Sequence, residues 1–287
     1  MSWQIKRTDN NCHTLNLDNK KKVTKRRILL LADIHWDNSH CDLKQLKKDL
    51  EQAKKDSIPV FIFGDFFCAM QGKYDPRSSQ DALRPEHRGG NYLDLLVETA
   101  TEWLMPYKDQ LALITPGNHE TSILKRHETN LTERLVTLLR HSGSKVEMGS
   151  YWGFVKATMG YDSTRSMGSI NIHYSHGYGG GGEITRGLID WSRVRGQYIA
   201  DVYVSGHIHR RNCDENVITS LTSAGSIKQS RQLFLRCGTY KDEHQPNGYH
   251  VEKGRAGRPI GGWWLEIESS YTAGDNNPSL DIVAVMT

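Results

Sequence analysis

The 287-residue sequence predicts an α/β fold built on two β-sheets. Short apolar runs with the composition of strands alternate with helical patterns through the first half of the chain. From Lys145 onward the pattern changes to consecutive strands, so a second sheet is expected to begin there. Five of the strand-like runs also end in His, Asp or Asn, and in α/β sheets ligands bind beyond the carboxyl ends of the strands.

The five runs share one design, in which an apolar strand is followed by side chains that can bind a cation or carry a proton. Carboxylates, amide oxygens and imidazoles are metal ligands, and imidazole also transfers protons near neutral pH. We therefore expect one polar cluster at the strand ends. Pro116-Gly117 breaks the third of these strands, so Asn118, His119 and Glu120 are expected on a loop at its end. The runs and their polar ends are 28–35 with Asp33 and His35, 60–65 with Asp65, 111–120 with Asn118, His119 and Glu120, 170–177 with His176, and 202–209 with His207 and His209.

Amphipathic patterns between these runs predict helices that return the chain to the sheet. A further helix is expected at Glu183–Arg195, after the glycine run Gly177–Gly182. Residues 1–19 either add an edge strand or are disordered. Strands are expected at 145–148, 151–158, 169–174, 217–222, 232–235, 262–267 and 280–285. The amphipathic patterns are Cys41–Lys54, whose N-cap is Asp42, Tyr92–Pro106 and Thr129–His141.

Composition argues against several classes of protein. With 37% hydrophobic and 24% charged residues, the chain is typical of soluble globular proteins. It has no apolar run of about 18 residues and lacks a charged-then-apolar leader. Neither membrane insertion nor secretion is therefore expected, and a cytoplasmic location is predicted. The 5 cysteines form no C-x-x-C pair, which fits a reducing compartment and argues against a zinc ribbon.

Part of the net charge of +4 lies in the basic run Lys20–Arg27, just before the first apolar strand. Such a run either contacts nucleic acid or acts as a targeting signal, or it is simply a solvated segment at the start of a strand. The solvated segment is the commoner case, and it is favoured here.

The polar strand ends form five motifs that follow one another along the chain: Asp33-x-His35, Gly64-Asp65, Gly117-Asn118-His119-Glu120, His176-Gly177 and Gly206-His207-x-His209. Together they resemble the signature of the calcineurin-like metallophosphoesterases, over roughly residues 28–210. The glycine run after His176 is similar to that of phage-type members. The resemblance implies a four-layer αββα sandwich at residues 28–287, preceded by a basic N-terminal extension at residues 1–27.

The resemblance also implies two divalent metal ions and gives each site residue a role. His119 would protonate the leaving group, and Glu120 would orient His119. A hydroxide bridging the two ions would attack the phosphate ester, and the mixed N and O ligands suit Mn, Fe, Co, Ni or Zn, of which Mn²⁺ is expected to support activity. The ligands would be Asp33, His35 and His209 for one ion, Asn118, His176 and His207 for the other, and Asp65 as the bridge.

Two departures from the family pattern bear on the substrate. Protein Ser/Thr phosphatases of the superfamily carry an Arg shortly after the Gly-Asp motif and a Gly after the first His. Here Gly64-Asp65 is followed by Phe66-Phe67-Cys68-Ala69-Met70, and His35 is followed by Trp36. Both differences argue against a phosphoprotein phosphatase.

We therefore expect a hydrolase of phosphate esters, with diesters of nucleic-acid or nucleotide type favoured over monoesters. A phosphomonoesterase, or a broad-specificity esterase using the same metal site, is the alternative. A non-catalytic binding protein of this fold is disfavoured, because every predicted ligand position is filled. The oligomeric state is left open.

Several segments beside the motifs have two readings. Gln71–Asn91 is either a substrate-facing lid or a surface excursion. Gly177–Gly182 either presents N–H groups to a phosphate or is merely flexible. The basic segment Thr239–Gly261 is expected to wall the rim of the site. His173 is expected to be a packed or rim histidine, and Trp263-Trp264 a core and edge pair.

Overall fold

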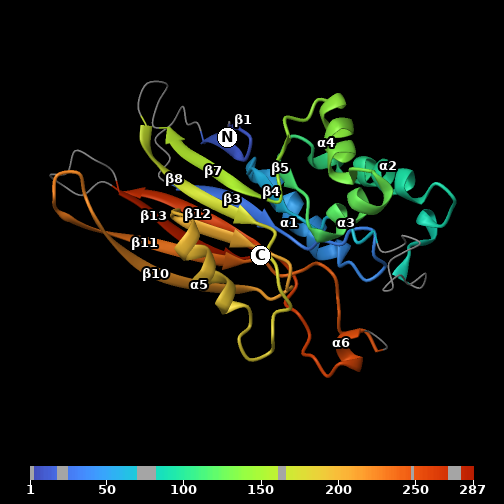
Figure 1. Ribbon diagram of the computed structural model, residues 1–287. Helices are drawn as coiled ribbons and strands as arrows, with labels where there is room; N and C mark the ends of the chain where they lie inside the picture. Colours follow the sequence, from blue (N-terminus) through green and yellow to red (C-terminus); the bar gives the residue numbers. More distant parts are fainter. Residues whose placement is uncertain (1–2, 18–24, 70–81, 161–165, 247–248, 271–278) are drawn as a thin grey trace.

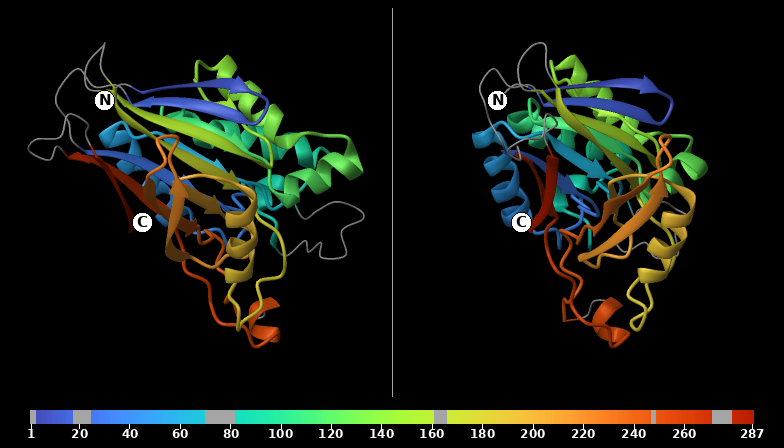
Figure 2. Two further views of the ribbon diagram at one scale, coloured as in Figure 1. Left: turned by 60° about the vertical axis from the view of Figure 1, so that its left-hand side comes forward. Right: turned by 90° about the vertical axis from the view of Figure 1, so that its left-hand side faces the viewer.

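Two β-sheets pack face to face, and helices cover both outer surfaces (Figure 1; Figure 2). The computed structural model describes residues 3–17, 25–69, 82–160, 166–246, 249–270 and 279–287. The six-stranded sheet has the order β13 (Ser279–Met286), β12 (Trp263–Ser270), β3 (Lys25–Leu31), β4 (Val60–Phe63), β5 (Leu111–Thr115) and β6 (Glu147–Met148). The seven-stranded sheet has the order β1 (Gln4–Asp9), β2 (Cys12–Leu17), β7 (Trp152–Gly160), β8 (Ser166–Ser175), β9 (Val202–Ser205), β11 (Ile227–Arg236) and β10 (Asn212–Leu221).

The central strands are apolar throughout because both of their faces are buried. In β3, Ile28 and Leu30 face the other sheet, whereas Leu29 and Leu31 face the helices. β4 repeats this alternation, with Phe61 and Phe63 directed into the space between the sheets. The period of two residues explains why the runs are strands and not helices.

Helices cover the two sheets unequally (Figure 1). The six-stranded sheet packs against α1 (Leu43–Asp56), α2 (Tyr92–Leu104), α3 (Asn118–His127) and α4 (Leu131–His141). The seven-stranded sheet is covered by α5 (Leu188–Gln197), where Trp191 packs on Phe234. The short α6 (Tyr249–Glu252) and the 3₁₀ turns η2 (Pro85–His87) and η3 (Met105–Tyr107) lie in connections. The predicted αββα layers are confirmed.

Three sequence predictions need correction. The strand at Glu147–Met148 pairs in parallel with β5 and thus belongs to the first sheet, so the second sheet resumes only at β7. α5 begins at Leu188, five residues later than predicted, after glycine-rich turns. Asn118 opens helix α3 and is not part of a loop, because the Glu120 carboxylate accepts the Gly117 N–H and caps the first turn.

The N-terminal segment is part of the sandwich. β1 and β2 form an antiparallel hairpin, and β2 pairs in parallel with β7. Leu15 and Leu17 are buried in the core between the sheets. The described part of residues 1–19 therefore forms edge strands, which was one of the two alternatives. The expected boundary after residue 27 does not separate this part from the sandwich.

Among the described residues, no helix combines the length and the apolar character needed to cross a membrane.

Asp42 is the N-cap of α1, as its sequence position predicts, and its carboxylate accepts the N–H of Gln45 at 2.9 Å. Replacing Asp42 by Ala leaves this N–H without its acceptor and is expected to lower the free energy of unfolding by about 1 kcal/mol. Urea denaturation followed by circular dichroism measures the loss. Asp42→Asn is the control, because Asn caps helices equally well, and a loss of similar size in this variant would contradict the capping role.

Candidate metal centre

The carboxyl ends of five strands converge at one end of the sandwich. β3, β4 and β5 are parallel neighbours in one sheet, and β8 and β9 are parallel neighbours in the other. The segments after these strands carry the nine polar residues singled out in the sequence. The structure brings these segments together across the two sheets, as expected for a site beyond strand ends.

One half of the cluster contains Asp33, His35 and His209, whose candidate ligand atoms all lie within 4.8 Å of one another. His209 Nε2 lies 3.4 Å from Asp33 Oδ1 and 3.1 Å from His35 Nε2. Asp33 Oδ1 is buried and accepts no hydrogen bond from the described residues. An anionic oxygen and two imidazole nitrogens thus converge on one point.

The other half contains Asp65, His176 and His207, again with ligand atoms within 4.8 Å of one another. His176 Nε2 lies 3.2 Å from Asp65 Oδ2. The Asn118 amide oxygen joins this set, because it lies 2.9 Å from His176 Nε2 and 2.7 Å from His207 Nδ1. The two halves adjoin, since His176 Nε2 is also 4.0 Å from Asp33 Oδ1.

These separations fit a shell of metal ligands. Ligand atoms about 2.1 Å from a cation, at octahedral or tetrahedral angles, lie roughly 3.0–3.4 Å from one another. The contacts are 3.1 and 3.4 Å in the first half and 2.7 to 3.2 Å in the second, and they join carboxylate oxygen, amide oxygen and imidazole nitrogen. The residues present therefore suit a pair of divalent ions of borderline hardness.

Close packing explains the glycines in the motifs. A Cβ added to Gly206 would lie 2.4 Å from Asp33 Oδ2, and one added to Gly64 would lie 2.4 Å from His176 Nδ1. The backbone is also strained, because five of the candidate ligands have left-handed φ angles that non-glycine residues rarely adopt. These residues are Asp33 (50°), His35 (49°), Asp65 (48°), His207 (74°) and His209 (55°).

The charges in the cluster favour a bound cation. Burial lowers the pKa of His209, but the Asp33 and Glu243 carboxylates outweigh burial and raise this pKa to about 10. In the same way, burial opposes the charge of His176, yet Asp65 and Asp33 raise its pKa to about 9. The buried carboxylates thus stabilise positive charge, whether a proton or a metal ion carries it.

His119 lies at the edge of the cluster with one nitrogen directed toward it. Its Nδ1 is 2.5 Å from the Cys68 carbonyl oxygen, whereas Nε2 is 3.7 Å from Asp65 Oδ2. With the proton on Nδ1 donated to this carbonyl, Nε2 is free to exchange a proton with a group at the site. The His119 backbone N–H also donates to Asp65 Oδ1 at 3.0 Å, so the two residues are fixed relative to each other.

The expectation that Glu120 orients His119 is wrong. Glu120 is 2% exposed, and its oxygens accept the backbone N–H groups of Asp65 at 3.2 Å, Phe67 at 2.8 Å and Gly117 at 2.8 Å. Its carboxylate therefore holds the loop after β4 against the start of α3. The Cys68 carbonyl holds the His119 ring instead.

Two residues near the site were missed in the sequence. Asp37 is buried and accepts the N–H groups of Cys68 and Ala69, at 2.5 and 3.0 Å, so it fixes the carbonyl that holds His119. Asp37 follows Asp33 and His35 at the same spacing of two residues, and this pattern could have identified it from the sequence. Glu243 lies 2.9 Å from His209 Nδ1 but follows no strand, so no pattern pointed to it.

The structure places three further features that the sequence analysis singled out beside the motifs. The start of Thr239–Gly261 lies against the site, since the Thr239 hydroxyl and Tyr240 N–H both donate to the Asp33 carbonyl. Residues 247–248 of this segment are outside the described residues. His173 is packed, as expected: it stacks on Tyr198, and burial lowers its pKa to about 4. Trp263 and Trp264 are each 6% exposed, which confirms their packing role.

The basic run and the proposed lid lie partly beyond the described residues. At the start of β3, Lys25 and Arg27 both pair with Glu266, at 2.6 and 2.7 Å, so these two charges are neutralised within the fold. Residues 20–24 are outside the described residues.

Residues 71–81 of the segment Gln71–Asn91 are also outside the described residues. In its remainder, Arg84 donates to the Asn38 carbonyl at 3.3 Å and 3.2 Å.

The sequence profile of one family, the calcineurin-like phosphoesterases, matches residues 26–211. The chain belongs to this family. The match ends just after His209 and thus covers all nine candidate residues of this family member. A search of curated proteins finds no match.

Solved structures that resemble this phosphoesterase do so at low identity. Vps29 of Chaetomium thermophilum is 11% identical with a TM-score of 0.39, over 92% of this chain and 98% of that chain. A predicted phosphoesterase of Streptococcus pneumoniae is 14% identical with a TM-score of 0.28, over 91% and 99%. A metallophosphoesterase of Sphaerobacter thermophilus is 12% identical with a TM-score of 0.33, over 90% and 88%.

Proposed function

We propose that this calcineurin-like phosphoesterase hydrolyses phosphate diesters with the aid of two divalent metal ions. The observation that carries the proposal is the pair of adjoining ligand sets, with Asp65 in one and Asp33 in the other, beside a histidine that is not needed as a ligand. A lone set would suit a structural ion equally well. Two adjoining sets are the arrangement that two-metal phosphoester hydrolysis uses.

The residue roles proposed are those that the family resemblance implies, and the contacts support them. Asp33, His35 and His209 would hold one ion, and Asn118, His176 and His207 the other. Asp65 would be the ligand shared between the two sets, because its Oδ2 lies 3.2 Å from His176 Nε2, which is itself 4.0 Å from Asp33 Oδ1 of the other set. When bound, two divalent ions supply Lewis acidity toward the phosphoryl oxygens and make a water molecule more acidic. Mn²⁺ is the proposed activating ion, with Fe, Co, Ni and Zn as alternatives.

His119 is the proposed general acid. Its Nδ1 is held by the Cys68 carbonyl, so Nε2 faces the cluster and can carry the proton that the leaving oxygen requires. Glu120 and Asp37 both hold the loop after β4, which carries the Cys68 carbonyl. This arrangement keeps the histidine in one orientation through the reaction.

The residues after Asp65 support a diester. Phe66, Phe67 and Cys68 are buried and uncharged, so this loop brings no cation to the phosphate beyond the metal ions. A diester carries one negative charge, whereas a monoester carries up to two and leaves the second unmatched here. We propose that N–H groups of the glycine run after His176 contact the substrate.

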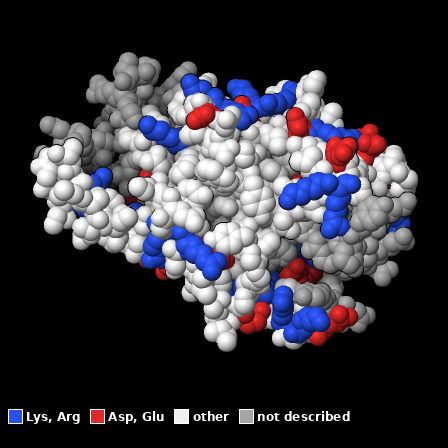
Figure 3. All heavy atoms as spheres, in the orientation of Figure 1, with Lys and Arg blue, Asp and Glu red and all other residues white. Residues whose placement is uncertain are grey.

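Surface charge favours a small substrate. On the face seen in Figure 3, Lys and Arg are dispersed in small groups, with Asp and Glu among them. Binding along a nucleic-acid backbone depends on many phosphate contacts, and this face of the described residues has no continuous basic stripe for it. We therefore favour a nucleotide or another small phosphodiester.

The substrate class is tested with model esters at saturating Mn²⁺. We expect kcat/KM for bis(p-nitrophenyl) phosphate to exceed that for p-nitrophenyl phosphate by about tenfold or more, because an unmatched charge worth about 1.4 kcal/mol gives that factor. A preference for the monoester would indicate a phosphomonoesterase. Equal hydrolysis of p-nitrophenyl acetate would indicate a broad-specificity esterase.

A further inference from the structure

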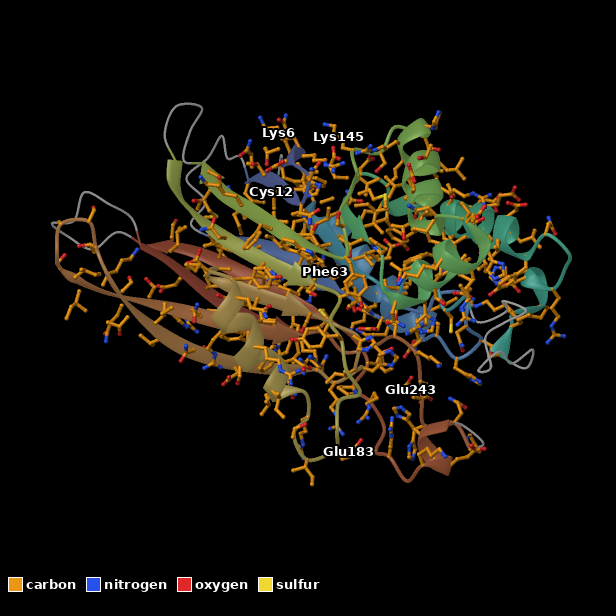
Figure 4. The ribbon with its side chains drawn as sticks, viewed as in Figure 1. Lys6, Cys12, Phe63, Lys145, Glu183 and Glu243 are labelled. Carbon is orange, nitrogen blue, oxygen red and sulfur yellow. The ribbon has the colours of Figure 1, made fainter. Side chains whose placement is uncertain are left out.

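The segment after β11 closes over the Asp33 loop and lies outside the part of the chain that matches the family profile. Tyr240 N–H donates to the Asp33 carbonyl at 3.1 Å, and Asp242 N–H donates to the His40 carbonyl at 2.9 Å. Three residues after Tyr240, the chain places Glu243 beside His209. Figure 4 shows Glu243 beyond the strand ends, on the connection that leads to α6.

Glu243 lies between two histidines. Its Oε1 is 2.9 Å from His209 Nδ1, and its Oε2 is 2.8 Å from His250 Nε2. Lys241 Nζ, a positive group, lies 3.7 Å from Oε1. The Glu243 side chain is 10% exposed and the His209 side chain 12% exposed, so the contact between them is largely shielded from solvent.

The two nitrogens of His209 face different partners. Nδ1 faces Glu243, whereas Nε2 faces Asp33 Oδ1 at 3.4 Å and His35 Nε2 at 3.1 Å. A neutral imidazole has one N–H and one lone pair, and the partner of the N–H decides which nitrogen carries the lone pair. A carboxylate at Nδ1 holds the proton there and leaves the Nε2 lone pair directed into the cluster.

We propose that Glu243 is a positioning residue that fixes the tautomer and orientation of His209 for cation binding with Asp33 and His35. The proposal rests on the proposed function, in that His209 is taken as a metal ligand. Carboxylates that accept the second N–H of a ligating histidine raise its basicity and fix its ring. Glu243 itself does not ligate the ion, because it faces the nitrogen of His209 that points away from Asp33.

His250 and Lys241 keep Glu243 in place. His250 comes from α6 and approaches the carboxylate oxygen that His209 does not use. The carboxylate is thus held from both sides, in the orientation that serves His209. The segment Thr239–Gly261 consequently contributes to the metal site and does not merely cover it.

The test is calorimetric titration of Mn²⁺ into metal-free protein, for wild type, Glu243→Ala and Glu243→Gln. Wild type is expected to bind two ions. Glu243→Ala should weaken one of the two sites by about 10- to 100-fold and leave the other unchanged. Glu243→Gln keeps a neutral acceptor for the Nδ1 proton, so its loss should be smaller than that of Glu243→Ala. Glu252→Gln, an exposed change on α6, is the matched control and should bind as wild type does.

The possible results separate the two proposals. If wild type binds two ions and Glu243→Ala binds both with unchanged affinity, the positioning role is overturned and the proposed function stands. Equal weakening of both sites, together with a lower melting temperature of the metal-free protein, would make Glu243 a structural ion pair and overturn the role as well. Failure of the wild-type protein to bind Mn²⁺, Fe²⁺, Co²⁺, Ni²⁺ or Zn²⁺ would overturn the proposed function and this inference with it.

Discussion

Replacing Asp65 by Asn is expected to lower kcat toward a phosphate diester by on the order of 10³-fold and to weaken the binding of both metal ions. Asp65 is 1% exposed, and its carboxylate faces His176 on one side and the His119 backbone N–H on the other. Asn has nearly the same shape but only one acceptor oxygen and no charge. Charge stabilisation worth several kcal/mol is lost, and each 1.36 kcal/mol is a factor of ten in rate.

Metal analysis and kinetics of the same preparations measure both effects. Asn118→Ala is the comparison, because Asn118 contacts His176 and His207 and should empty mainly their site. Asp214→Asn, an exposed change on β10, is the control for loss of a carboxylate elsewhere. Two ions bound by Asp65→Asn at wild-type affinity would contradict the bridging role of Asp65.

Replacing His119 by Asn should cause a defect that depends on the leaving group. A general acid contributes about 10²- to 10⁴-fold, and it matters only when the leaving oxygen needs a proton in the transition state. Alkyl and nucleoside leaving groups need this proton, whereas nitrophenolate does not. We expect His119→Asn to lose roughly 10²- to 10⁴-fold on alkyl esters, to lose far less on nitrophenyl esters, and to keep both metal ions.

The measurement is a series of diesters with leaving groups of increasing basicity, assayed for wild type and His119→Asn at saturating Mn²⁺. The slope of log kcat against leaving-group pKa should become steeper in the variant. His127→Asn, at the far end of α3, is the control and should not change the slope. An equal loss across the series would mean that His119 positions the phosphate or supports a metal ion, and it would exclude the role of general acid.

The candidate ligands were predictable from sequence because each follows a buried strand. A run such as Val60–Phe63 has no polar residue of its own, so the first polar side chain after it marks the strand end. The parallel pairing of β3, β4 and β5, and of β8 and β9, then places these ends together. Local pattern and sheet geometry thus suffice for the position of the seven candidate ligands.

Contacts between distant backbone groups were not predictable in this way. Glu120 follows His119 directly, so sequence proximity pointed to the imidazole, but its carboxylate is used by the N–H groups of Asp65 and Phe67, more than fifty residues away. β6 was assigned to the wrong sheet for the same reason, since strand composition does not reveal the partner strand. The left-handed φ angles of Asp33 and His35 likewise arise from tertiary packing.

Glu243 is a residue near the site that no sequence pattern identified. It lies in the segment Lys241–His250, which has no apolar periodicity and whose described residues include only the beginning of the short helix α6. Its partner His209 is 34 residues earlier in the sequence, and only the return of the chain over the Asp33 loop brings them together. Residues of this kind, which orient a ligand without being one, require the three-dimensional structure.

The most direct test of the central claim is metal content measured together with activity in one preparation. Metal-free protein is titrated with Mn²⁺, and bound metal and hydrolysis of bis(p-nitrophenyl) phosphate are recorded at each step. We predict that two ions bind per chain and that hydrolysis appears as the second site fills. Saturation without hydrolysis of any phosphate ester, or no binding of Mn²⁺, Fe²⁺, Co²⁺, Ni²⁺ or Zn²⁺, would contradict a dinuclear phosphoesterase centre.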